Sequence, residues 1–225
     1  MTPQVRSFAR RALWLLPVWA LFLFLATLTR QPDPQTAFAE FAEYVTTTVF
    51  LVSHLAASIG GAALGSIGVA TLALYLHETK GGRRTVAGMA ATLAGNIFLT
   101  SVFGAAAYAQ PAMGRLFKAG EQNAQVFYNE VYGAPLFGVA ILGLLLFMVG
   151  GALAGMGIAA SGRFPRWTGW AYAVSAVGFA LSFILLPIGM SVFSAVLAAA
   201  TATIAWSAAR ESRAEIAGPA LSPGN

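Results

Sequence analysis

The sequence predicts an all-α fold: a polytopic transmembrane bundle of six helices, with both termini in the cytoplasm and interfacial helices on the outer side. The 225 residues are 58% hydrophobic and 9% charged, whereas a soluble domain carries about 25% charged residues. Several apolar runs also reach the roughly 20 residues that cross about 30 Å of hydrocarbon. The charges lie between these runs, and the positive ones favour every second gap.

The first span is expected at residues 12–29, after Arg6, Arg10 and Arg11. A basic segment before an apolar run is also typical of a signal peptide. No small-residue cleavage site follows this run, because it ends in Thr-Leu-Thr-Arg. We therefore expect the span to be retained.

A short interfacial helix is expected next, from Thr36 to Tyr44. Asp33 and Pro34 have the residue types of an N-cap and of the first helical position. Its two faces differ, with Phe38 and Phe41 on one side and Glu40 and Glu43 on the other.

Five further spans follow, at about residues 45–76, 85–109, 135–160, 168–186 and 188–208. The pair Gly81-Gly82 is expected to end one helix and to allow the next helix to begin. Pro111 is expected to open a long outer loop that ends near Gly133. The segment 210–225 holds proline, glycine and serine with little apolar material, which predicts a disordered cytoplasmic tail.

Charge decides the orientation, because cytoplasmic segments carry an excess of lysine and arginine. One set of segments holds ten bases, and the other holds three, namely Arg30, Arg115 and Lys118. Both termini are therefore expected in the cytoplasm, with the chain in a bacterial inner membrane. The ten bases are Arg6, Arg10, Arg11, Lys80, Arg83, Arg84, Arg163, Arg166, Arg210 and Arg213.

The net charge of +5 does not indicate nucleic-acid binding, because no basic run carries interleaved aromatic residues. The bases at the span ends instead meet anionic headgroups, so the lipid bilayer is the expected partner. The chain has no cysteine, which excludes thiolate catalysis and cysteine-ligated metal sites.

Glycines repeat along the predicted spans at intervals that suit helix packing. Gly61 and Gly65 lie four apart, and Gly143, Gly150 and Gly157 lie seven apart. Lipid provides no hydrophobic reason for helices to associate, so small residues must allow close backbone contact. We expect these faces to pack helices together. The alternatives are a substrate path, or contact with a membrane partner or a second copy of the chain.

No Asp, Glu, Lys or Arg lies inside a predicted hydrocarbon core, which disfavours ion-coupled transporters and proton pumps. The candidate site residues there are His54, with Ser58 on the same helical face, and Asn96, flanked by Thr92 and Thr100. Counted from the outer span ends, His54 and Asn96 should lie at comparable depths. We expect an interhelical hydrogen bond, with a ligand, proton or haem site as the alternative.

A metal site is not expected. His54 and His77 are 23 residues apart, about 35 Å along one helix at 1.5 Å per residue, so they cannot share a metal or a haem. We expect no cofactor, and a haem held by His54 alone is the remaining alternative. The sequence contains no HExxH, GxSxG or P-loop motif.

The outer loop is expected to form an amphipathic helix over the bundle. The alternative is a lid or a surface for a partner. Tyr128 and Glu130 would then be its polar contacts.

One segment resembles a loop of a broad group of uncharacterised bacterial multi-pass membrane proteins. The segment is Ser161-Gly162-Arg163-Phe164-Pro165-Arg166-Trp167. In that group a basic Pro-Arg-Trp turn joins two late helices of a small bundle. The resemblance implies a fold type and no activity.

These observations predict an integral inner-membrane protein, either a non-catalytic accessory subunit or a sensor-like binding module whose ligand enters from the outer side. The alternatives are a small-solute transporter or channel, and a haem- or quinone-linked membrane oxidoreductase subunit. The absence of catalytic motifs disfavours an enzyme.

Overall fold

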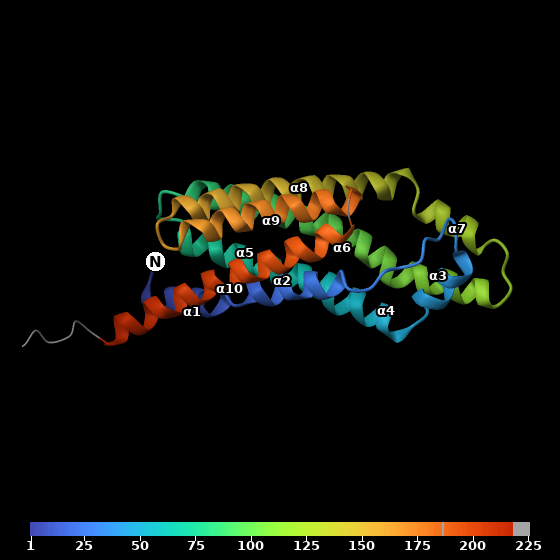
Figure 1. Ribbon diagram of the computed structural model, residues 1–225, viewed down its shortest axis with the longest axis horizontal. Helices are drawn as coiled ribbons and strands as arrows, with labels where there is room; N and C mark the ends of the chain where they lie inside the picture. Colours follow the sequence, from blue (N-terminus) through green and yellow to red (C-terminus); the bar gives the residue numbers. More distant parts are fainter. Residues whose placement is uncertain (186, 218–225) are drawn as a thin grey trace, which may run out of the picture.

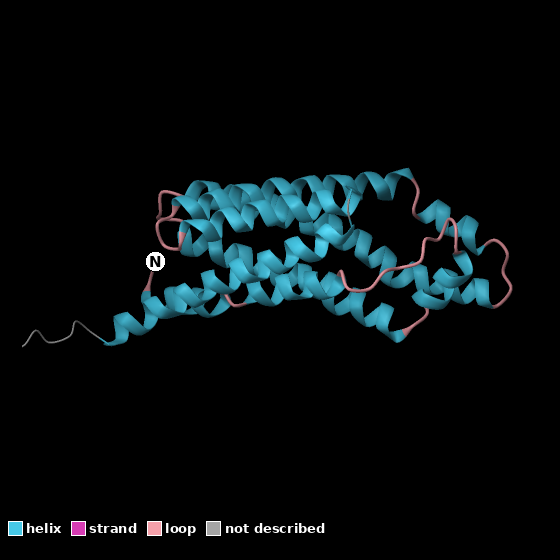
Figure 2. Ribbon diagram, in the orientation of Figure 1, coloured by secondary structure: helices cyan, strands magenta, loops and turns pink. Residues whose placement is uncertain are grey.

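The computed structural model describes residues 1–185 and 187–217, and every regular element within them is helical. This confirms the all-α class. The molecule is elongated, with long helices side by side and short helices at the end away from the N-terminus (Figures 1 and 2). The helices are α1 (Pro3–Ala12), α2 (Leu15–Ala26), α3 (Phe38–Val45), α4 (Thr48–Val52), the π-helix η1 (Ser53–Gly60), α5 (Gly61–Leu76), α6 (Gly82–Lys118), α7 (Ala124–Val131), α8 (Ala134–Ala160), α9 (Arg166–Leu185) and α10 (Pro187–Ala217).

Five helical runs are long and apolar enough to cross a membrane: Pro3–Ala26, Thr48–Leu76, Gly82–Lys118, Ala134–Ala160 and Ile188–Glu211. They confirm that the chain has the composition of a multi-pass membrane protein. The predicted span 168–186 corresponds to α9, which has 20 residues but is not among the five. The described residues therefore confirm five of the six predicted spans.

The long helices form a closed ring in which each contacts its neighbours in the sequence. The order is α2, α5, α6, α8, α9 and α10, and α10 closes the ring against α2. At the end of this closure away from the N-terminus, the Thr27 and Ser191 hydroxyls lie 2.8 Å apart. At the other end, Arg10 Nη2 lies 4.0 Å from Glu211 Oε2. Polar contacts thus join the first and last long helices at both ends.

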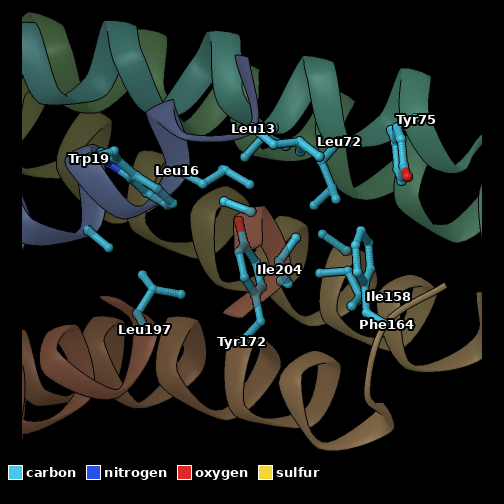
Figure 3. Close-up of a cluster of buried hydrophobic side chains, with 14 of the residues drawn as sticks. Leu13, Leu16, Trp19, Leu72, Tyr75, Ile158, Phe164, Tyr172, Leu197 and Ile204 are labelled. Atoms are coloured by element: carbon cyan, nitrogen blue, oxygen red, sulfur yellow. The ribbon is translucent and has the colours of Figure 1, made fainter. Parts of the chain in front are cut away.

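Apolar side chains fill the centre of this ring. Leu16, Trp19, Leu72, Tyr172 and Leu197 are all buried in one cluster. The Tyr172 ring extends from α9 toward Leu16 and Leu72 of the opposite helices (Figure 3). The ring axis at this level is therefore packed rather than hollow.

A glycine seam joins α6 to α8. A methyl group added at Gly150 would lie 2.5 Å from the Thr92 nitrogen, and one added at Gly88 would lie 2.5 Å from the Ala154 nitrogen. Only glycine permits this approach of the two backbones. The predicted packing role of Gly143, Gly150 and Gly157 is therefore confirmed, since all three face α6.

The other small-residue faces are also covered within the chain. Gly155 of α8 lies against the Gly169 carbonyl of α9, and Gly61 and Gly65 lie against Trp19 of α2. These faces are therefore not open to a second copy. Gly138 of α8 differs, because a methyl group there would meet nothing within 4 Å.

The first helical run, Pro3–Ala26, begins before the predicted span 12–29 and is divided into α1 and α2 next to a proline. Pro17 has no N–H for the Leu13 carbonyl, and its ring would clash with that carbonyl in a continuous helix. Leu13 O instead accepts from Leu16 N at 3.2 Å.

The expectation that Pro111 opens a loop is wrong. Pro111 lies inside α6, which continues to Lys118 and has 37 residues. Beyond the proline, Gly114 packs closely against the Ala42 carbonyl and Val45 of α3. We infer that this contact keeps the helix intact where the proline removes one hydrogen bond.

Two other segments differ in extent from the sequence-based expectation. Asp33 and Pro34 form a turn in which Asp33 Oδ1 accepts from Gln35 N at 2.9 Å, and α3 begins four residues later than Pro34, at Phe38. α10 continues past Ala208 to Ala217. Residues 210–217 of the predicted tail are thus helical, and 218–225 lie outside the described residues.

Candidate functional site

A small helical cap covers the end of the bundle opposite the N-terminus (Figure 1). We use "cap" for α3, α7 and the part of α6 from Ala106 onward. At 1.5 Å per residue α6 is about 55 Å long, whereas the hydrocarbon core is about 30 Å thick. The last part of α6, with α3 and α7 against it, therefore projects beyond the hydrocarbon.

Aromatic rings form the core of the cap. The Phe41 centroid lies 5.2 Å from Tyr128 and 5.4 Å from Phe38, and Phe38 lies 5.1 Å from Phe117 of α6. Phe38 and Phe41 are buried while Glu40 and Glu43 are exposed, so the predicted two-sided helix is confirmed. The cap is thus a small apolar cluster separate from the bundle core.

Polar contacts close the cap at its edges. Gln35 Nε2 donates to Asn129 Oδ1 at 2.8 Å, and Gln125 Nε2 donates to the Pro34 carbonyl at 3.2 Å. They connect the segment before α3 to α7 across 94 and 91 residues of sequence, respectively.

His54 lies where the cap core meets the second span. Phe50, in the cap cluster, has its ring centroid 4.1 Å from that of His54. His54 Nδ1 lies 3.0 Å from the Phe50 carbonyl. A carbonyl only accepts, so Nδ1 carries the proton in this hydrogen bond and Nε2 of the neutral ring is left as an acceptor. His54 is half-buried.

The helix around His54 is a π-helix, Ser53–Gly60. Its i→i+5 hydrogen bonds turn the chain less per residue than an α-helix does, and such segments are frequent at functional sites. The prediction that Ser58 lies on the same helical face as His54, and that this face continues to Gly61, assumed α-helical spacing throughout. In the structure, Gly61 faces Phe22 and Trp19 of α2, and Ser58 is half-buried in the π-helix.

Asn96 bonds to a different part of the second span. Its Nδ2 donates to Ser66 Oγ at 3.0 Å and to the Ala62 carbonyl at 3.3 Å. Asn96 is thus level with Ala62 and Ser66, eight to twelve residues deeper than His54. The expected equal depth is wrong, because it counted from Tyr108 as the end of a span that continues to Lys118.

The other predicted site residues are separated. Thr92 is buried against Gly150 of α8, and its hydroxyl has no hydrogen-bond partner among the described residues. Thr100 is half-buried, and Glu130 is exposed on α7. Tyr128 lies in the cap core, where burial, and secondarily the charge of Asp33, raise its pKa.

Sequence reasoning did not single out Gln110, which is buried in the part of α6 that belongs to the cap. Its Oε1 and the Tyr132 hydroxyl are buried without a hydrogen-bond partner among the described atoms. Burial raises the pKa of Tyr132. Nothing in the sequence indicated this burial, because Gln110 directly precedes Pro111, where the helix was expected to end.

The second histidine is remote from the cap. His77 Nδ1 lies 2.7 Å from the Leu74 carbonyl, and its Nε2 lies 3.2 Å from Glu78 Oε1. In residues 1–185 and 187–217, no group of three or more His, Asp or Glu side chains could hold a metal ion. The two best-formed cavities of the described chain also lie away from His54, Ser58 and Asn96, near Arg84 and near Arg6.

No family model matches this chain, and comparisons with curated proteins and with solved structures find no match. The resemblance of Ser161–Trp167 to uncharacterised bacterial membrane proteins therefore stays a prediction.

Proposed function

We propose that this chain is a six-span protein of a bacterial inner membrane, with both termini in the cytoplasm, and that it functions by binding at its outer cap. The role is that of a non-catalytic accessory subunit or a sensor-like module. The burial of Phe50 carries the proposal, because this residue of the second span lies in the cap cluster and its ring packs on His54 four residues later.

The count of six rests on α9. This helix has 20 residues, enough to cross about 30 Å, and it packs between α8 and α10 in the closed ring. The orientation rests on charge: the loops that carry Lys80 and Arg163 lie at the same end as the N-terminus (Figure 1), and bases favour the cytoplasmic side.

Binding is favoured over transport because the ring is packed along its centre by Trp19, Leu72 and Tyr172. A small-solute path past Ser58, His54 and Asn96 would need a cavity there, and Asn96 is instead engaged by Ser66 and Ala62. A haem- or quinone-linked oxidoreductase subunit remains the second alternative, with His54 Nε2 as the available acceptor.

Orientation is tested by single cysteines, since the chain has none of its own. We expect a membrane-impermeant maleimide to label Asn123→Cys from outside intact cells and to label Lys80→Cys only after lysis. Labelling of Lys80→Cys from outside would contradict the orientation.

Function is tested with a photoreactive residue at Phe127, which is 50% exposed on α7 of the cap. We expect a discrete adduct in membranes from cells, absent when the same residue replaces lipid-facing Val174. His54→Leu should reduce the adduct without lowering the thermal unfolding temperature, and His77→Leu should leave both unchanged.

Three results would contradict the proposal. The first is a lack of any adduct at Phe127, and the second is solute flux into proteoliposomes that Asn96→Leu abolishes. The third is a co-purifying chromophore lost in His54→Leu, which would favour the oxidoreductase alternative.

A further inference from the structure

The end of α8 near the basic loops is recessed between its two neighbours. Gly157 allows α8 to pack closely on α6, and Gly155 allows it to pack closely on α9. The outward side of α8 carries Leu145 and Val149 in its middle and then Met156 and the smaller Ala160 near its end, while Ala159 lies at the edge of this side against Gly169 of α9. Close packing on both sides and small residues in front leave a depression over the last turns of α8.

An open groove of about 310 Å³ occupies this depression. Met156, Ala159 and Ala160 of α8 form its floor, and Arg84 of α6 and Arg166 and Trp170 of α9 form its walls. This volume is at the lower end of the range for small-molecule sites, about 300–1,000 Å³. The groove is thus large enough for a polar headgroup.

The walls of the groove suit an anionic phosphate. Arg84 and Arg166 are exposed, and neither forms an ion pair with another described residue. Guanidinium groups bind phosphate oxygens in a bidentate way. Both arginines also lie in the first turn of a long helix, α6 and α9 respectively, where the helix dipole favours negative charge.

The floor suits an acyl chain rather than a free ion. Met156, Ala159 and Ala160 present apolar atoms, and the surface continues toward Val149, which is 47% exposed. Trp170 is 48% exposed on the wall, and tryptophan prefers the level of the headgroups. Arginines at the edge of the groove and apolar atoms at its base match the phosphate and the first part of the acyl chain of a phospholipid.

We propose that this groove binds an acidic phospholipid, with its phosphate between Arg84 and Arg166 and the start of one acyl chain over Met156 and Ala160. The proposal requires that the chain span a membrane. It goes beyond the outer-side role above and does not depend on it, because the groove lies at the opposite end of the bundle.

The test measures lipid selectivity of the full chain in micelles with equal phosphatidylglycerol and phosphatidylcholine. Native mass spectrometry gives the ratio of the two retained lipids. Each arginine that contacts a lipid phosphate is expected to contribute about 1 kcal/mol, so Arg84→Gln with Arg166→Gln should reduce the preference for phosphatidylglycerol about thirtyfold. Arg11→Gln with Arg83→Gln removes the same charge near the same end but outside the groove, and should change it about twofold or less.

A second variant separates the groove from its charge. Ala160→Leu keeps both arginines and fills the floor, so it should also lower phosphatidylglycerol retention while the protein stays monodisperse. An unchanged ratio in Ala160→Leu would overturn the proposal, and so would an equal loss in both arginine pairs. Displacement of the lipid by inorganic phosphate at constant ionic strength would show a small-anion site instead, and would also overturn it.

Discussion

The two ends of α6 pack by opposite means. In the ring, Gly88 and Gly95 bring its backbone against that of α8. In the cap, Phe117 of the same helix packs its ring on Phe38 of α3. Small residues thus bring α6 and α8 together in the ring, and large aromatic residues pack α6 against α3 in the cap.

The difference follows from the solvent around each part. Hydrocarbon gives no hydrophobic gain when helices meet. Helices in the ring therefore use glycines, which lack a side chain, so that their backbones can pack in close van der Waals contact. The cap projects beyond the hydrocarbon, where burying an aromatic side chain removes a large apolar area from water. The packing style of a segment thus indicates whether it lies inside the bilayer.

The largest effect is expected from Phe41→Ala in the cap. Phe41 is fully buried, and such a truncation costs about 3–5 kcal/mol. Hydrogen exchange should accelerate in α3 and α7 and stay slow in the ring, because the two clusters are separate. The exposed neighbour Glu40→Ala should change neither. Equal acceleration in the ring would show that cap and ring unfold as one unit.

A smaller effect is expected from Gly150→Ala in the α6–α8 seam. The added methyl group would overlap the Thr92 backbone, and overpacking of this kind costs about 1–3 kcal/mol. Thermal unfolding in detergent should occur at lower temperature. Gly138→Ala on the same helix adds the same group in open space and serves as the control. If both variants melt together, the seam does not stabilise the ring.

The smallest effect is expected from Asn96→Ala, the polar contact inside the ring. Hydrogen bonds between membrane helices contribute about 0.6 kcal/mol on average and about 1.7 at most. A double-mutant cycle with Ser66→Ala isolates the pair. The coupling energy should be positive and within this range, and a value near zero would show that Asn96 bonds to Ala62 alone.

Local patterns predicted part of the fold well. The seven-residue spacing of Gly143, Gly150 and Gly157 predicted a packing face, because a fixed spacing keeps residues on one side of a helix. The alternation of Phe38 and Phe41 with Glu40 and Glu43 predicted the buried side of α3 for the same reason. Both inferences needed only neighbours on one helix.

The candidate site was predicted less well, because it depends on contacts between distant segments. Pro111 carries a local signal for a helix end, and the packing of Gly114 on α3 overrides it. The π-helix at Ser53–Gly60 has no local signature of its own, and it moves His54 out of register with Gly61. His54 and Asn96 were each placed in a membrane span, but their separate partners, Phe50 for the first and Ser66 with Ala62 for the second, could not follow from the sequence.

The closed ring also bears on how the chain is made. Each long helix lies beside the one synthesised just before it, so every span can dock on a neighbour as soon as it enters the membrane. The last helix alone must find the first, and it does so through Thr27 with Ser191 and Arg10 with Glu211. A chain whose synthesis stopped after α9 would therefore form an incomplete ring, in which the face of α2 that contacts α10 is exposed to lipid or to a membrane chaperone.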